Sequence, residues 1–158
     1  MSHSIRGFII LKNLSRFIAT VGYTGYIPYA PGTFGSAVGF VFIILIKPED
    51  SVLLVILIAV FFLGVITSGN AEKFLGKDSG HIVIDEFCGY LLAVLFVPRN
   101  MGYLIAAFIL FRIFDIIKPP PLKNIEEKAS GGIGIMLDDV MAALYANLCV
   151  QVWRLVIH

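Results

Sequence analysis

An uncharged apolar run, SVLLVILIAVFFLGVITS at residues 51–68, limits most strongly what this chain can fold into. The run approaches the roughly 20 residues that an α-helix needs to cross the hydrocarbon core of a bilayer. Hydrophobic residues make up 58% of the 158 residues, whereas a soluble domain has about 45–50%. We therefore expect lipid, rather than water, to surround much of this chain.

Four further apolar segments accompany this run, at residues 33–47, 82–97, 103–118 and 137–157. Several are shorter than a full membrane crossing, and flanking turns and snorkelling side chains would supply the missing length. The pattern predicts an all-α, polytopic membrane helix bundle with about five transmembrane helices. Because the chain has no internal repeat and no long linker, we expect a single domain over residues 1–158, with the bundle at 23–158.

The first 22 residues predict an amphipathic helix. Their apolar residues recur at roughly helical spacing, and Arg6, Lys12 and Arg16 interrupt any signal-peptide core. Such a helix would lie in the membrane interface with its basic face toward the lipid headgroups. An ordinary packing helix is the alternative, and the sequence does not decide between the two.

Five crossings would place the N-terminus, the 69–81 loop and the 119–136 loop on the same side of the membrane. That side carries most of the basic residues: Arg6, Lys12, Arg16, Lys73, Lys77, Arg112, Lys118, Lys123 and Lys128. The other side has only Lys47, Arg99 and Arg154. By the positive-inside rule, the first side is cytoplasmic. The net charge of +1 gives no reason to expect a nucleic-acid partner.

Five carboxylates lie at the predicted cytoplasmic ends of the segments. Asp85 and Glu86 open the third segment, Asp115 lies near the end of the fourth, and Asp138 and Asp139 open the fifth. Carboxylates in a membrane are unfavourable, but they are tolerable if they face one another around cations such as Mg²⁺, which prefers oxygen ligands. Interaction with helix dipoles would explain one acidic pair, but explains two pairs plus Asp115 less well.

Basic and glycine-rich stretches lie beside these acids. Arg112, Asp115 and Lys118 share one helix face, where they would form internal salt bridges or hold a phosphate. APGTFGS places Thr33 and Ser36 at a helix start, either as an anion site or as a plain N-cap with close packing. GGIGIM at 131–136 predicts a flexible approach to the two aspartates. No covalent nucleophile is evident, which favours attack on a phosphoryl group by metal-activated water.

Four stretches make the sequence similar to a known family: IPYAPGTFGS, KDSGHIVIDEFCG, FRIFDIIKPPPL and GGIGIMLDDVMA. In this order and spacing they resemble the phosphatidylglycerophosphatase A family over about residues 22–145. The resemblance implies a multi-pass enzyme of the bacterial inner membrane, with its N-terminus and active site cytoplasmic. The enzyme would use Mg²⁺ to remove the terminal phosphate of the phospholipid phosphatidylglycerophosphate, giving phosphatidylglycerol.

The resemblance also assigns residues by matching position. It implies metal-site acids at Asp85, Glu86, Asp138 and Asp139, a charged stripe at Arg112, Asp115 and Lys118, and further matching positions at Thr33, Ser36 and Asp78. Lys77 adds basic charge that would attract an anionic lipid, as would Lys73 and Lys123.

The mechanism expected from these residues is hydrolysis with one or two Mg²⁺ in the acid cluster. Arg112 and Lys118 would hold the phosphate, helped by the 33–36 turn, and Asp85 or Asp139 would act as the base. An ion or proton transporter that uses intramembrane carboxylates is the alternative. Acids gathered at one interface speak against it, because a transporter needs access from both sides. The sequence leaves the oligomeric state open.

Overall fold

The structure is a computed structural model that describes residues 2–77, 79–120 and 131–157. Within these residues every regular element is helical, which confirms the all-α prediction. The elements are α1 (Ser2–Ala19), the 3-10 helix η1 (Thr24–Tyr26), α2 (Pro31–Ile46), α3 (Asp50–Leu75), α4 (Ile84–Ala93), α5 (Met101–Ile117) and α7 (Gly131–Ile157). The five predicted apolar segments correspond to α2, α3, α4, α5 and α7, with shifted boundaries.

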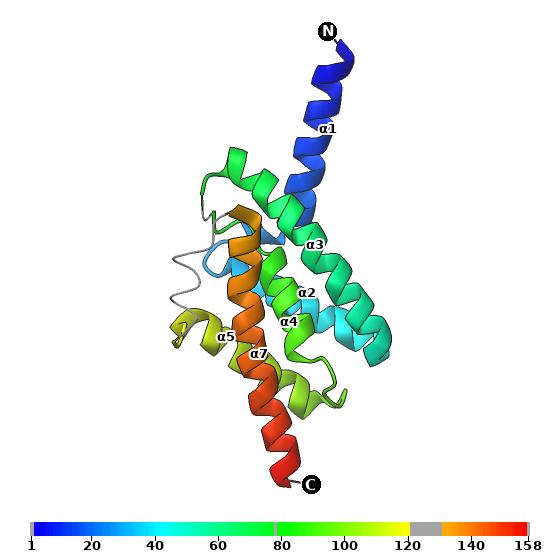
Figure 1. Ribbon diagram of the computed structural model, residues 1–158, viewed down its shortest axis with the longest axis vertical. Helices are drawn as coiled ribbons and strands as arrows, with labels where there is room; N and C mark the ends of the chain where they lie inside the picture. The colour runs from blue at the N-terminus through cyan, green and yellow to red at the C-terminus, as the bar shows by residue number, and fades with distance from the viewer. Residues whose placement is uncertain (1, 78, 121–130, 158) are drawn as a thin grey trace.

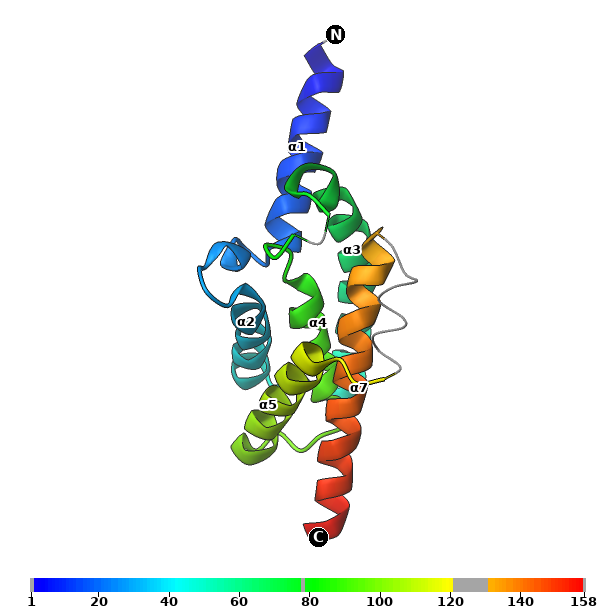
Figure 2. The same ribbon diagram turned by 90° about the vertical axis from the view of Figure 1, so that its left-hand side faces the viewer.

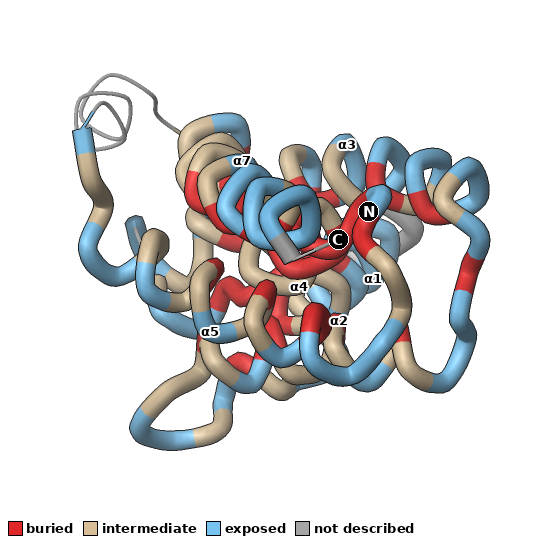
Figure 3. Tube along the Cα trace, turned by 90° about the horizontal axis from the view of Figure 1, so that it is seen from below, coloured by how far each residue is buried: buried red, intermediate tan, exposed pale blue. Residues whose placement is uncertain are grey.

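The short helix α4 forms the centre of the bundle. It packs against α2, α3, α5 and α7, and Figures 1 and 2 show it enclosed by longer helices in both views. Cys88, Tyr90 and Leu91 in α4 are completely buried. Figure 3 shows buried segments gathered in the interior and exposed residues along the outer faces. The core is therefore built around α4.

Two helices, α3 and α7, are long and apolar enough to cross a membrane. Only 28% of the apolar window of α3, and 33% of that of α7, is buried within the protein. The core helix of a soluble protein would be buried over most of its length, so the exposed apolar faces of α3 and α7 fit contact with lipid. These two helices support membrane association, while a total of five membrane-spanning helices stays a prediction.

Helix α1 ends against the bundle and begins away from it. Phe74 of α3 packs under Lys12 and Arg16, whose charged groups lie 5.2 and 5.4 Å from the centre of its ring. Toward the N-terminus Phe8 and Ile10 are exposed, and Figure 1 shows α1 projecting from the other helices. The predicted N-terminal helix is present. Its position in the membrane interface stays a prediction.

The glycines before the two aspartates are helical, so the prediction of a flexible approach at 131–136 was wrong. A Cβ atom on Gly132 would lie 1.9 Å from the carbonyl oxygen of Val65, and one on Gly64 would lie 2.5 Å from Met136 Sδ. These glycines let α3 and α7 touch closely, which favours helix here despite the low helix propensity of glycine. The aspartates therefore lie about two turns inside α7 rather than at its start.

Helix α3 is longer than predicted and α4 is shorter. The run predicted at 51–68 continues as helix to Leu75, which reduces the predicted 69–81 loop to the few residues before α4. The segment predicted at 82–97 is helical only at Ile84–Ala93. The amide of Asn147 in α7 donates to the carbonyl oxygens of Leu92, Ala93 and Leu95 at 3.2, 3.0 and 2.8 Å. Because Asn147 satisfies these carbonyls, α4 can end inside an apolar bundle.

Candidate active site

The polar residues singled out in the sequence come from four helices that meet at one place. Asp85 and Glu86 lie in the first turn of α4, and Asp139 lies on the face of α7 that packs against α4. Arg112 and Asp115 come from the end of α5. The first turn of α2 closes the site from the other side, against Glu86.

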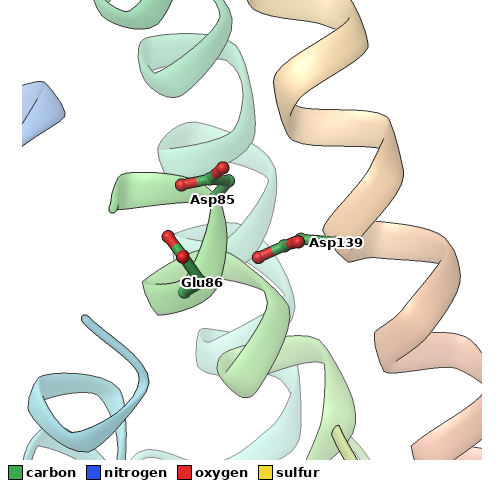
Figure 4. A group of neighbouring side chains, drawn as sticks. All are labelled: Asp85, Glu86 and Asp139. Atoms are coloured by element: carbon green, nitrogen blue, oxygen red, sulfur yellow. The ribbon is translucent and has the colours of Figure 1, made fainter. Parts of the chain in front are cut away.

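Asp85, Glu86 and Asp139 form a group of carboxylates able to hold a cation. One oxygen from each lies within 4.8 Å of the other two, and Figure 4 shows Asp139 extending from α7 toward the start of α4. Asp85 Oδ1, Glu86 Oε2 and Asp139 Oδ2 are buried and accept no hydrogen bond from the described residues. Buried like charges without partners are strongly unfavourable. A bound cation would offset the repulsion between the carboxylates and would give their buried oxygens a partner, so these residues fit a metal ion.

A second group of carboxylates shares Asp139 with the first. It consists of Asp115, Asp138 and Asp139, again with one oxygen each within 4.8 Å. Two-metal phosphatase sites hold neighbouring ions between shared acidic ligands, and the cluster has oxygen donors for one or two cations. Asp115 was predicted among the five carboxylates that would face one another around cations, and by matching position as part of a charged stripe. The structure places it among the acids that could hold a metal.

Two cationic side chains border the carboxylates. Arg112 Nη1 lies 2.7 Å from Asp115 Oδ2 and 3.9 Å from Glu86 Oε1, while Lys118 pairs with Asp138. Lys118 ends α5 in a left-handed conformation with φ of 48°, directly before the prolines. The structure thus contains the internal salt bridges considered as one reading of this stripe. It also places both cations beside the acids.

The first turn of α2 lies directly against the acids. A Cβ atom on Gly32 would lie 2.1 Å from Glu86 Oε1 and 3.0 Å from Arg112 Nη2, so only glycine fits there without a shift. Thr33 follows it and is half-buried. Ser36 is fully buried, and its hydroxyl donates to the carbonyl oxygen of Gly32 at 3.0 Å. Its hydroxyl proton is therefore used within the helix, and its predicted contact with substrate stays a prediction.

Other predicted residues lie apart from this cluster or outside the described part of the chain. Lys77 is exposed in the turn after α3, and within the described residues it forms no ion pair with the cluster. Asp78 lies outside the described residues, as does Lys123. His81, to which no role was assigned, has its Nδ1 2.9 Å from the carbonyl oxygen of Gly25 and stacks on Tyr26.

The fold and site together define a class of protein: an all-helical, membrane-associated protein with a buried acidic cluster suited to a metal ion and to a phosphate. Comparison with known proteins narrows this class. The family model described as phosphatidylglycerophosphatase A matches residues 17–154, nearly the whole chain. The chain belongs to the phosphatidylglycerophosphatase A family, as its four sequence motifs predicted.

Individual relatives agree with the family match. A phosphatidylglycerophosphatase A of Haemophilus influenzae is 38% identical over 93% of this chain and 94% of its own length. The Escherichia coli K12 protein of the same name is 35% identical over 80% of this chain and 76% of its own. A Bacteroides thetaiotaomicron protein named putative phosphatidylinositol-3-phosphatase is 37% identical over 85% and 89%. No solved structure gives a significant match to the chain.

Proposed function

We propose that this chain is a Mg²⁺-dependent phosphatidylglycerophosphatase that hydrolyses the terminal phosphomonoester of phosphatidylglycerophosphate at the cytoplasmic surface of a bacterial inner membrane. Family membership supports the reaction. The structural observation that carries the proposal is the pair of carboxylate groups sharing Asp139, with Arg112 and Lys118 beside them. A transporter is not favoured, because the three relatives described above are all named as phosphatases.

The choice of Mg²⁺ follows from the donor atoms. Within the described residues both candidate groups consist of carboxylates alone, and hard oxygen donors suit Mg²⁺, while histidine and cysteine suit softer metals. When bound, Mg²⁺ would neutralise charge on the phosphate and make water a better nucleophile. Asp85, Glu86, Asp138 and Asp139 would hold the metal, and the position of Asp115 adds it to this set.

The remaining chemistry comes from the charged residues around the acids. Arg112 and Lys118 would hold the phosphate oxygens. Both are paired with carboxylates in this structure. A bound phosphate would therefore interact with cations that also pair with Asp115 and Asp138. Asp85 or Asp139 would accept the proton of the attacking water, through a carboxylate oxygen that does not bind the metal. Thr33 would add a hydroxyl from the start of α2.

The proposed topology has five crossings with the N-terminus in the cytoplasm. The excess of basic residues on the side of the N-terminus supports this orientation. Helix α4 has only ten residues, about half of a membrane crossing. Its crossing would be completed by the turn at 94–97, whose backbone contacts Asn147 and Arg99. Val94, Leu95 and Val97 of this irregular segment are buried, while Phe96 is exposed, and the hydrogen-bonded carbonyls support its place in a membrane interior.

Phosphate release by the purified chain in mixed micelles tests the proposal. The substrates are phosphatidylglycerophosphate and, because of the name of the Bacteroides relative, phosphatidylinositol 3-phosphate. Each is measured with Mg²⁺ and after chelation. The proposal predicts Mg²⁺-dependent release from phosphatidylglycerophosphate. Faster release from the inositol lipid would contradict the substrate assignment, and release that is insensitive to chelation would contradict the metal assignment.

A further inference from the structure

A second feature next to the acidic cluster is an apolar groove between α2 and α5. It has a volume of about 240 Å³ and is lined by Ala37 and Phe40 of α2 and by Ile105 and Phe108 of α5. Among the described residues its lining is entirely apolar. Ile105 is exposed, so the groove reaches the outer surface of the bundle. Figure 2 shows α2 and α5 on the same side of the molecule, away from α3 and α7.

One wall of the groove consists of aromatic rings that pack against one another. The rings of Phe40 and Phe108 meet edge to face, with centroids 5.9 Å apart. Tyr90 of α4 contacts both rings at 5.8 Å and is itself completely buried. The hydroxyl of Tyr90 donates to the carbonyl oxygen of Leu104, which fixes the ring. Rigid aromatic surface of this kind binds flexible apolar groups with little loss of its own conformational freedom.

The groove continues directly from the candidate site. Along α2, Ala37 lies one turn after Thr33, and along α5, Phe108 lies one turn before Arg112. One turn is about 5–6 Å along a helix. Gly32 and Arg112 are in close approach at the site end. Because α2 begins and α5 ends there, the two helices extend from the site side by side with antiparallel chain directions. The charged cluster and the apolar groove therefore lie on successive turns of α2 and α5, the cluster at the site end and the groove one turn further on.

We propose that this groove binds an acyl chain of the lipid whose phosphate lies at the acidic cluster. The proposal rests on the proposed function. An occupant of both sites needs an anionic phosphate and an apolar chain separated by a short linker, which is the order of groups in a phospholipid. The groove would hold the lipid with its phosphate facing Arg112, so Ala37 and Ile105 would set how strongly the enzyme prefers long acyl chains.

Groove-filling substitutions test this through substrate selectivity. The ratio of kcat/KM for dioleoyl over dihexanoyl phosphatidylglycerophosphate is measured for Ala37→Trp and Ile105→Trp. We expect each to lower that ratio about tenfold, because the indole would occupy the space of the long chain. Ala59→Trp, at an exposed position of α3, is the matched control and should leave the ratio unchanged. An unchanged ratio in both groove variants would overturn the proposal, whereas a wild-type chain inactive on both lipids would instead overturn the proposed function.

Photo-crosslinking tests occupancy without depending on turnover or on a variant that folds. The wild-type chain is irradiated with phosphatidylglycerophosphate that carries a diazirine in one acyl chain. Label is expected on peptides containing Phe40 and Phe108, and excess unlabelled phosphatidylglycerophosphate, but not phosphatidylcholine, should remove it. Label spread evenly over the exposed faces of α3 and α7, or label at the groove that either lipid displaces equally, would overturn the proposal.

Discussion

Gly32 faces Glu86 so closely that a methyl group on this glycine would lie 2.1 Å from Glu86 Oε1. This contact joins the start of α2 to the acidic cluster in α4. It explains why a glycine follows the proline that begins α2, independently of any role in binding an anion. The glycine-rich start of α2 is therefore a packing surface that fixes the position of a candidate metal ligand.

Replacing this glycine should disturb the chemistry more than the fold. In Gly32→Ala the Glu86 carboxylate must move away from its neighbours, and we expect turnover to fall by about 100-fold, as displacement of a catalytic group by about 1 Å can cause. Phosphate release at saturating Mg²⁺ measures the effect. Gly7→Ala is the control, since an added Cβ there meets no atom within 4 Å. Equal activity of the two variants would show that this contact does not matter.

Arg112 should be required for turnover, beyond any loss of stability from the carboxylates that its removal leaves unpaired. Arg112→Gln removes the cation that pairs with Asp115 and Glu86, and kcat is expected to fall about 100- to 1000-fold, the usual effect of losing one donor that stabilises transition-state charge. Steady-state kinetics and thermal unfolding are measured together. Arg99→Gln is the comparison, because Arg99 pairs with Asp50 away from the acidic cluster. It should lower the unfolding temperature but leave kcat near wild type, and the opposite pattern would refute the assignment of Arg112.

Asn147 should matter for stability and not for chemistry. Its amide satisfies three carbonyls at the end of α4, and Asn147→Leu would leave them without this donor inside the bundle. Loss of buried hydrogen-bond partners predicts destabilisation of about 1–3 kcal/mol. Thermal unfolding in detergent measures it, with Mg²⁺-dependent kcat recorded below the transition. A variant as stable as wild type would mean that another group satisfies these carbonyls.

The contact between α3 and α7 should also be sensitive to one methyl group. In Gly132→Ala the added atom would lie 1.9 Å from the Val65 carbonyl oxygen, which forces the helices apart. Overpacking of this kind predicts a loss of about 1–3 kcal/mol, seen as a lower unfolding temperature. Gly102→Ala in α5 makes only an ordinary contact of 3.5 Å and serves as control. If both variants unfold alike, the close approach of the two helices is not tight.

The sequence predicted which residues meet because it predicted where the chain reverses direction between apolar segments. Asp85, Asp115 and Asp139 lie near the ends of predicted apolar segments that an alternating path brings to the same side, so their convergence followed from the order of these segments. Their depth did not follow. The stretch GGIGIM indicated a loop, and it is helical because Val65 lies against Gly132. That contact depends on how α3 and α7 cross, which no local pattern in the sequence contains.

Two other features of the structure could not be predicted from local patterns in the sequence. The end of α4 at Ala93 depends on Asn147, which is more than fifty residues away in the sequence, and an asparagine inside an apolar segment carries no sign of its partner. The contact of Gly32 with Glu86 likewise depends on packing between α2 and α4. The glycine motif was recognised in the sequence. Glycine is typical both of an anion site and of a close packing contact, so the motif could not distinguish these two roles.

The most direct test of the account is the role of Asp139, the residue common to both carboxylate groups. Mg²⁺-dependent phosphate release from phosphatidylglycerophosphate and the shift in unfolding temperature on adding Mg²⁺ are measured for wild type and Asp139→Asn. Glu49→Gln, which neutralises an exposed carboxylate before α3, is the control. The account predicts that Asp139→Asn loses both the activity and the Mg²⁺-induced shift, while the control keeps both. A folded Asp139→Asn protein that retains wild-type turnover and the wild-type shift would contradict it.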